Sequence, residues 1–184
     1  MPIYISFLRG INVSGKRIIH MIELQALYEL LDFQNVKTYI QSGNVLFLSK
    51  EISSEKLCKK IELAIKEKWG FFVPVIIRTP EELKSVITKF PFGKEVEEKT
   101  RAVSFLNKMP KESNLELLKN EIFEVDKFHI RGCEIYLHYP LGQANTKLTN
   151  NLIEKKLQVN STIRNWKTIQ KMIALSEVFK EVSD

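Results

Sequence analysis

Two kinds of hydrophobic pattern alternate along the first part of the chain, and their order constrains the fold more than any other feature of the sequence. Helix-type runs place an apolar residue every three or four positions from Met21 to Leu31 and again between Ser53 and Gly70. Strand-type runs, rich in β-branched and aromatic residues, are expected at 3–8, 36–41, 44–48 and 71–78. Together the two kinds of run give the order β-α-β-β-α-β, which is that of the split βαβ, or ferredoxin-like, unit.

Pro74 gives an independent check on this topology. Proline cannot donate a hydrogen bond to a ladder, so the strand that contains Pro74 belongs at a sheet edge or at a bulge. The split βαβ unit has the strand order 4-1-3-2, which places the fourth strand at an edge. The same topology brings the end of the first strand next to the hairpin turn at Ser42-Gly43. We therefore expect the loop after the first strand and the segment Gln41–Asn44 to lie side by side.

The second half of the chain repeats this order of elements, with no visible repeat of residues. Thr79 with Glu82 forms a capping box that opens a connecting helix, and Ser113 with Glu116 predicts the start of another helix. Asn165 has the position of an N-cap for the last helix. Further strands are expected at 102–106, 123–130, 134–139 and 161–164, and a further helix at 148–157.

We therefore predict an α+β protein of two ferredoxin-like (split βαβ) subdomains in tandem, with antiparallel sheets and helices on one face. The predicted boundaries are 1–79 for the first subdomain, 80–100 for a connecting helix and loop, and 101–184 for the second subdomain with its C-terminal helix. The order of elements alone suggests a duplication.

The composition is that of an ordinary globular chain of 184 residues. The net charge of +6 permits an acidic partner, but the lysines are scattered among glutamates, which is typical of a solvated surface. Cys58 and Cys133 form no metal-ligand spacing, and neither do His20, His129 and His138. Because there is no signal peptide and no run as long as a membrane span, we expect a cytoplasmic protein without a membrane partner. We also expect no cofactor and no metal.

The most distinctive stretch is the loop Arg9–Lys16, which holds two glycines, an amide and two cations between a strand and a helix. Glycine lets a backbone approach a ligand closely, and free N–H groups at a helix start attract anions. Gly10 to Lys16 spells the phosphate-loop pattern G-x-x-x-x-G-K, but Arg17 stands where Ser or Thr would hold magnesium, and the sheet is antiparallel. We therefore expect a looser site for phosphate, nucleotide or carboxylate. The alternative is that the glycines only shape a turn and Asn12 satisfies its own backbone.

The segment Gln41–Asn44 is more polar than a hairpin turn requires. Its two carboxamides either contact a ligand beside the loop or tie the loop in place, and we favour the second interpretation. No nucleophile elbow or catalytic triad is present, so the sequence names no catalytic residue and leaves open whether the protein is an enzyme. The candidate ligand-binding residues are Arg9, Gly10, Asn12, Gly15, Lys16, Gln41, Ser42 and Asn44.

Four segments resemble the signature of a bacterial domain-of-unknown-function family, number sixteen-ninety-seven: Phe7–Val13, Tyr39–Val45, Tyr136–Pro140 and Thr162–Trp166. The resemblance spans nearly the whole chain. It implies an α+β fold of two ferredoxin-like subdomains and no assigned activity. Ser14 departs from the family pattern, which often has a second glycine beside Gly15. Arg164 lies in the last signature, and its planar guanidinium suits phosphate or carboxylate. With Lys147 and Thr149 it is predicted to form a second cationic spot.

The leading prediction is a small anionic ligand bound at the first strand-to-helix loop, and three alternatives stay open. The run Ile3–Leu8 is close to the second ribonucleoprotein motif, which favours an RNA-binding module on the sheet face, but Asn44–Leu48 offers only one aromatic residue for stacking. An enzyme acting on a phosphorylated substrate would need a titratable group beside the loop. A structural or protein-interaction protein would need an exposed apolar patch.

Overall fold

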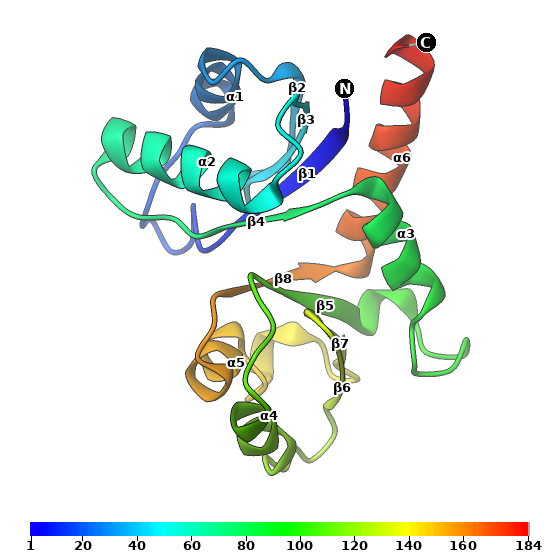
Figure 1. Ribbon diagram of the computed structural model, residues 1–184. Coiled ribbons are helices and arrows are strands. Elements are labelled where there is room, and N and C mark those ends of the chain that lie inside the picture. The colour runs from blue at the N-terminus through cyan, green and yellow to red at the C-terminus, as the bar shows by residue number, and fades with distance from the viewer. Residues whose placement is uncertain (184) are drawn as a thin grey trace. The chain divides into compact units, whose positions relative to one another are not determined.

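The computed structural model describes the chain from Met1 to Ser183, leaving aside the side chains of Asn145 and residues 180–183 (Figure 1). The chain forms two compact units. The first combines residues 1–85 with the segment that begins at Lys171, and the second is Val86–Gln170. The boundaries fall inside two helices, α3 (Pro80–Thr88) and α6 (Trp166–Ser183). No helix among the described residues has both the length and the apolar character needed to cross a membrane.

The first unit is a four-stranded antiparallel sheet with two helices on one face (Figure 1). The edge position of the fourth strand is confirmed. The predicted strand 71–78 is too long, because Pro74 lies outside the ladder and only its carbonyl is used, as the acceptor for the Arg9 N–H. In spatial order the strands are β2 (Gln34–Tyr39), β3 (Asn44–Leu48), β1 (Ile3–Leu8) and β4 (Val75–Arg78), and the helices are α1 (Met21–Leu30) and α2 (Ser54–Trp69).

Local sequence explains the ends of α2, and side-chain burial explains why the helices lie where they do. The Ser53 hydroxyl accepts a hydrogen bond from the Lys56 N–H, and Gly70 ends the helix in the left-handed conformation with φ of 76°. The apolar faces of both helices pack on alternate residues of the sheet. The main members of this core are Tyr4, Leu8, Leu24, Leu27, Tyr28, Val45, Phe47, Leu57, Ile61, Ile65, Val75 and Ile77.

The second unit has the same architecture. Its sheet has the order β6-β7-β5-β8, which matches the first sheet, and its core lies under two short helices. The predicted strand 123–130 is wrong at its start, since the ladder begins at Lys127. The elements are η1 (Glu98–Thr100), β5 (Arg101–Leu106), α4 (Glu112–Lys119), β6 (Lys127–Arg131), β7 (Glu134–His138), η2 (Gln143–Asn145), α5 (Asn150–Leu157) and β8 (Ser161–Asn165).

Two of the three helix starts predicted for this part of the chain are confirmed. The Thr79 N–H donates to the Glu82 carboxylate at 2.7 Å, and the Glu82 N–H donates to the Thr79 hydroxyl at 3.2 Å, which is a capping box. The Asn165 side chain accepts from the Thr168 N–H at 2.8 Å. The capping box at Ser113 is wrong, because α4 begins at Glu112 and its N-cap residue is Lys111.

The strand registers reveal a repeat of residues, which the sequence alone did not show. Leu8 pairs with the first residue of β4, and Leu106 pairs with the first residue of β8, so β1 aligns with β5 and β4 with β8. Identical residues then fall at matching positions. They are Ser6-Phe7-Leu8 with Ser104-Phe105-Leu106, and Ile77-Arg78 with Ile163-Arg164.

Matching hydrogen bonds accompany the matching residues. In each half the N–H of the last leucine of the first strand donates to a carbonyl in the hairpin turn, and the next N–H donates to the residue before the edge strand. In each half a glutamate of the second helix accepts from the first N–H of that edge strand. The pairs are Leu8–Gly43 and Leu106–Cys133, Arg9–Pro74 and Asn107–Asn160, and Glu62–Val75 and Glu154–Ser161.

Candidate functional site

Three segments meet at one end of the first sheet, and we call this surface the loop rim: residues 9–20, 40–43 and 71–74. The Leu8 N–H donates to the Gly43 carbonyl at 2.9 Å, and the Arg9 N–H donates to the Pro74 carbonyl at 2.9 Å. These bonds join the end of β1 to the β2–β3 turn and to the start of β4. The predicted juxtaposition of the first loop with the hairpin turn is confirmed.

Asn12 fixes the loop to the turn through its side chain. Its amide nitrogen donates to the Ile19 carbonyl at 2.9 Å and to the Gln41 carbonyl at 2.8 Å, and its amide oxygen accepts from the Ile19 N–H at 2.9 Å. The Asn12 backbone is left-handed, with φ of 55°, a conformation that asparagine adopts more readily than most other residues. All three hydrogen bonds serve the loop itself, so Asn12 acts as a brace.

The tip of the loop is a small hairpin. The Lys16 N–H donates to the Val13 carbonyl at 3.0 Å, and the Asn12 N–H donates to the Arg17 carbonyl at 3.2 Å. Ser14 and Gly15 between them both have positive φ, 49° and 71°, which is the pattern of a type I′ turn. A phosphate loop wraps its amides around a ligand, whereas here the Lys16 amide closes the turn. The G-x-x-x-x-G-K pattern therefore has a structural explanation.

The β2–β3 turn is also held by its own side chains. The Asn44 amide donates to the Tyr39 carbonyl at 2.9 Å and to the Ser42 hydroxyl at 3.0 Å, and Asn44 is buried. The Gln41 side chain is exposed, and the backbone carbonyl of Gln41 accepts the hydrogen bond from the Asn12 side chain. Of the two interpretations of these carboxamides, the contacts of Asn44 support the structural one.

The side chains of the loop rim that carry charge at neutral pH are all cations. Residues 9–20, 40–43 and 71–74 contain no aspartate or glutamate, and the first carboxylate of the chain is Glu23. Lys16, Arg17 and His20 are exposed, and Arg9 is half-buried. Within the described part of the chain, the side chains of Lys16 and Arg17 make no hydrogen bond or ion pair. Such a one-signed surface attracts anions.

Arg17 was missed as a candidate, because the sequence pattern treated it only as a mismatch to the phosphate-loop motif. Its guanidinium folds back over the loop, 3.8 Å from the point where a side chain on Gly10 would begin. Gly10 has a left-handed backbone, with φ of 67°, which glycine adopts without strain. The signal that would have found Arg17 is the absence of any carboxylate between Met1 and Ile22.

The predicted second cationic spot has no comparable openness. Arg164 is buried in β8, where one guanidinium nitrogen donates to the Thr162 hydroxyl at 2.7 Å and to the Ile163 carbonyl at 3.0 Å. Burial lowers the pKa of this guanidinium to about 10. Thr149 is the N-cap of α5, and Lys147 is exposed. The contacts of Arg164 and Thr149 stabilise the fold and do not test whether an anion binds here, so the second cationic spot stays a prediction.

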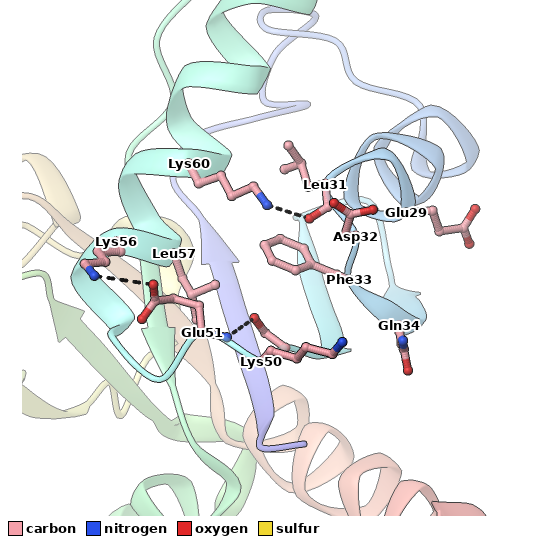
Figure 2. A pocket seen from close by; sticks show the side chains of 11 residues that line it. Glu29, Leu31, Asp32, Phe33, Gln34, Lys50, Glu51, Lys56, Leu57 and Lys60 are labelled. Carbon is pink, nitrogen blue, oxygen red and sulfur yellow. Dashed lines mark hydrogen bonds and ion pairs between the residues drawn. The ribbon is translucent and has the colours of Figure 1, made fainter.

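A cavity of about 650 Å³ lies at the opposite end of the first sheet (Figure 2). The Lys60 ammonium donates to the Leu31 carbonyl at 2.7 Å and lies 5.2 Å from the Phe33 ring centre, and Lys56 is 3.6 Å from Glu51. Glu29 and Asp32 also line it. Its lining carries charges of both signs, with Lys56 paired to Glu51, so it offers an anion less than the loop rim does.

Other predicted features can be placed briefly. Among the described residues, no group of three or more His, Cys, Asp or Glu side chains is arranged to hold a metal ion. His129 and His138 lie on neighbouring strands but are not direct partners, because the register sets His129 opposite Tyr136 and His138 opposite Lys127. On the face of the first sheet away from α1 and α2, Ile5, Phe7, Leu46 and Ile76 are buried, and the register adds the half-buried Tyr39 beside Asn44. RNA stacking requires an open aromatic platform, which this face lacks.

Comparisons with known proteins were consistent with the resemblance seen in the sequence. A family described as "Protein of unknown function (DUF1697)" matches residues 1–136. Among solved structures, the chain is similar to conserved bacterial protein SP0830 from Streptococcus pneumoniae, with 21% sequence identity, a TM-score of 0.72, and coverage of 94% of this chain and 97% of that one. This similarity supports the fold alone. No curated protein matches the chain.

Proposed function

Because this chain belongs to the DUF1697 family of proteins of unknown function, its activity has to be inferred from its own geometry, and we propose that it binds an anionic group at the loop rim. The ligand class is phosphate, nucleotide or carboxylate. The observation that carries the proposal is that three segments without a single carboxylate meet there, with Lys16, Arg17 and His20 exposed and Arg9 half-buried.

The second half of the chain supports this proposal by contrast. The equivalent connection between β5 and α4 takes five residues, 107–111, whereas the connection between β1 and α1 takes twelve, 9–20. The frame therefore closes without a long loop. Loops that exceed what the fold needs are disproportionately sites of binding.

The braced geometry of the loop is also suited to binding. Asn12 and the type I′ turn hold the hairpin in one conformation, so its cations are presented without a large loss of conformational freedom on binding. Because these cations are exposed, the attraction is expected to weaken steeply with ionic strength. The groups with the best access are Lys16 and Arg17, and the roles first assigned to Asn12 and Asn44 are taken by structural bonds.

The test is the affinity for inorganic phosphate and pyrophosphate at low ionic strength, measured by isothermal titration calorimetry. We expect the double variant Lys16→Ala, Arg17→Ala to bind roughly tenfold more weakly, since a hydrogen bond to a charged group contributes about 1.5 kcal/mol. The matched control is Lys108→Ala, which removes an exposed cation from the equivalent short loop of the second half. Equal affinities for the double variant, the control and the wild type would refute the proposal.

A further inference from the structure

The loop rim exposes apolar side chains as well as cations. Five of them, all aliphatic except one phenylalanine, are between 47% and 85% exposed: Val13, Ile18, Ile22, Ile40 and Phe72. Each comes from a different part of the rim or its border. Val13 and Ile18 flank the hairpin tip, Ile22 is in the first turn of α1, Ile40 is in the β2–β3 turn, and Phe72 precedes β4. A group of this kind on one surface marks an interaction site.

These side chains stand on a protruding surface. Every residue from Val13 to Ile18 is exposed, and so are Ile40 and Gln41 in the adjacent turn. An enclosed small-molecule site buries most of its ligand in a concave pocket. A protruding tip is instead suited to entering a soft, extended partner.

The charges on the same tip narrow the partner further. Lys16 and Arg17 lie between Val13 and Ile18 in the hairpin, and the three rim segments carry no carboxylate. Glu23 of α1 and Glu67 of α2 lie on the helices that border the rim, and Lys66 and Lys68 lie next to Glu67 in α2. Apolar side chains flanked by cations are the combination that binds the interface of an anionic bilayer, where the apolar groups enter the headgroup region and the cations meet the phosphates.

We propose that the loop rim docks on the surface of an anionic lipid bilayer, with Val13 and Ile18 entering the headgroup region and Lys16 and Arg17 contacting lipid phosphates. The charge part of this contact rests on the anion-binding function proposed above. The sequence led us to expect no membrane partner because no segment could span a bilayer, but surface docking needs no such segment. A nucleic acid is disfavoured, since of the two phenylalanines in the rim segments only Phe72 is exposed, Phe71 is half-buried against the core, and stacking needs several open rings.

The test is cosedimentation of the whole protein with vesicles made from equal parts phosphatidylglycerol and phosphatidylcholine, and with vesicles of phosphatidylcholine alone. We expect the wild type to pellet with the anionic vesicles and to stay in solution with the neutral ones. Removing the apolar tip with Val13→Ser, Ile18→Ser should lower the partition roughly tenfold. The matched control Met109→Ser alters an exposed apolar residue of the short loop 107–111 and should leave the partition unchanged.

Phosphate titration separates this proposal from the one on which it rests. The Val13→Ser, Ile18→Ser variant keeps every cation, so its affinity for inorganic phosphate should equal that of the wild type while its vesicle binding falls. A wild type that binds phosphate but stays in solution with anionic vesicles would overturn the docking and leave the anion site standing. A loss of vesicle binding no larger than that of Met109→Ser would overturn it too.

Discussion

The two halves of this protein share one frame and differ in what that frame carries. In both halves the same strand order, the same Ser-Phe-Leu segment and the same three hydrogen bonds around the edge strand recur. After that segment the first half continues into a braced, cationic loop of twelve residues, and the second half turns into its helix after five. The shared features are therefore what the fold requires, and the long loop is a feature of the first half that this frame does not require.

The comparison also shows where the second half has lost a contact. The Ser6 hydroxyl is 2.8 Å from the Tyr28 hydroxyl in the buried core of the first unit. The equivalent Ser104 hydroxyl is buried with no hydrogen-bond partner among the described residues. A buried polar group without a partner is unfavourable, so the same serine has opposite energetic roles in the two halves.

The largest difference is expected between the two hairpin turns. Gly43 has φ of 74°, and an added Cβ would come 2.7 Å from the Ile11 side chain and 2.8 Å from the Leu8 Cβ, whereas Gly132 has φ of 62° and no such neighbour. Gly43→Ala should therefore lower the free energy of unfolding by about 3 kcal/mol, from strain plus overpacking. Gly132→Ala should lower it by about 1 kcal/mol, from strain alone. Urea unfolding measures both, and similar losses would show that the first turn is not tightly packed under the loop.

A smaller difference is expected between the two serines. Ser6→Ala leaves the buried Tyr28 hydroxyl without its partner and should lower the free energy of unfolding by about 1–2 kcal/mol. Ser104→Ala removes an unpaired hydroxyl and should be neutral or slightly stabilising. Thermal unfolding of the two variants side by side gives the answer. If Ser104→Ala destabilised as much as Ser6→Ala, the contrast between the two cores would be wrong.

The smallest effect concerns Glu62, which accepts the Val75 N–H at 2.9 Å as Glu154 accepts the Ser161 N–H at 2.8 Å. Glutamine keeps the oxygen that accepts the hydrogen bond. The Glu62→Gln and Glu154→Gln variants should therefore each differ little from the wild type in the free energy of unfolding when both are measured at the same pH. Burial raises the pKa of the Glu62 carboxyl above its ordinary value of 4.5, against the lowering effects of the Val75 amide and Lys59.

The sign of the pH dependence follows from that raised pKa. The folded state holds the Glu62 proton more tightly than the unfolded state, so its contribution to stability is present below pH 4.5 and is lost as pH rises through the folded pKa. Glu62→Gln cannot lose a proton, so its stability relative to the wild type should rise between acid and neutral pH. Urea midpoints over that range measure it, and a flat or falling difference would contradict the assigned burial effect.

Local rules predicted much of the fold from the sequence. The caps at Thr79 and Asn165 depend on neighbouring residues only, and both are confirmed. The wrong cap at Ser113 has the same origin, because its pattern with Glu116 is acceptable locally but the N-cap is Lys111, so the helix starts two residues earlier than predicted.

What the sequence could not give depends on contacts between distant residues. The repeat of residues is visible only once the strand registers align β1 with β5, since few of the matching residues are identical. From its residue type alone, Arg164 is a candidate for contact with an anionic ligand. Only the fold shows that its guanidinium donates hydrogen bonds to residues of its own strand. At the loop rim, topology correctly brought the loop to the turn, but the brace at Asn12 and the position of Arg17 over Gly10 required the structure.

The central claim is that the long loop of the first half carries an anion site that the equivalent short loop of the second half lacks, and amide chemical-shift mapping tests it most directly. A ¹⁵N-labelled sample would be titrated with inorganic phosphate at low ionic strength. Saturable shifts should gather in residues 9–20 and 40–43, while the equivalent residues 107–111 and the turn at Gly132 stay unchanged. Shifts of equal size in both halves, or shifts centred on the cavity near Lys60 and Glu51, would contradict the account.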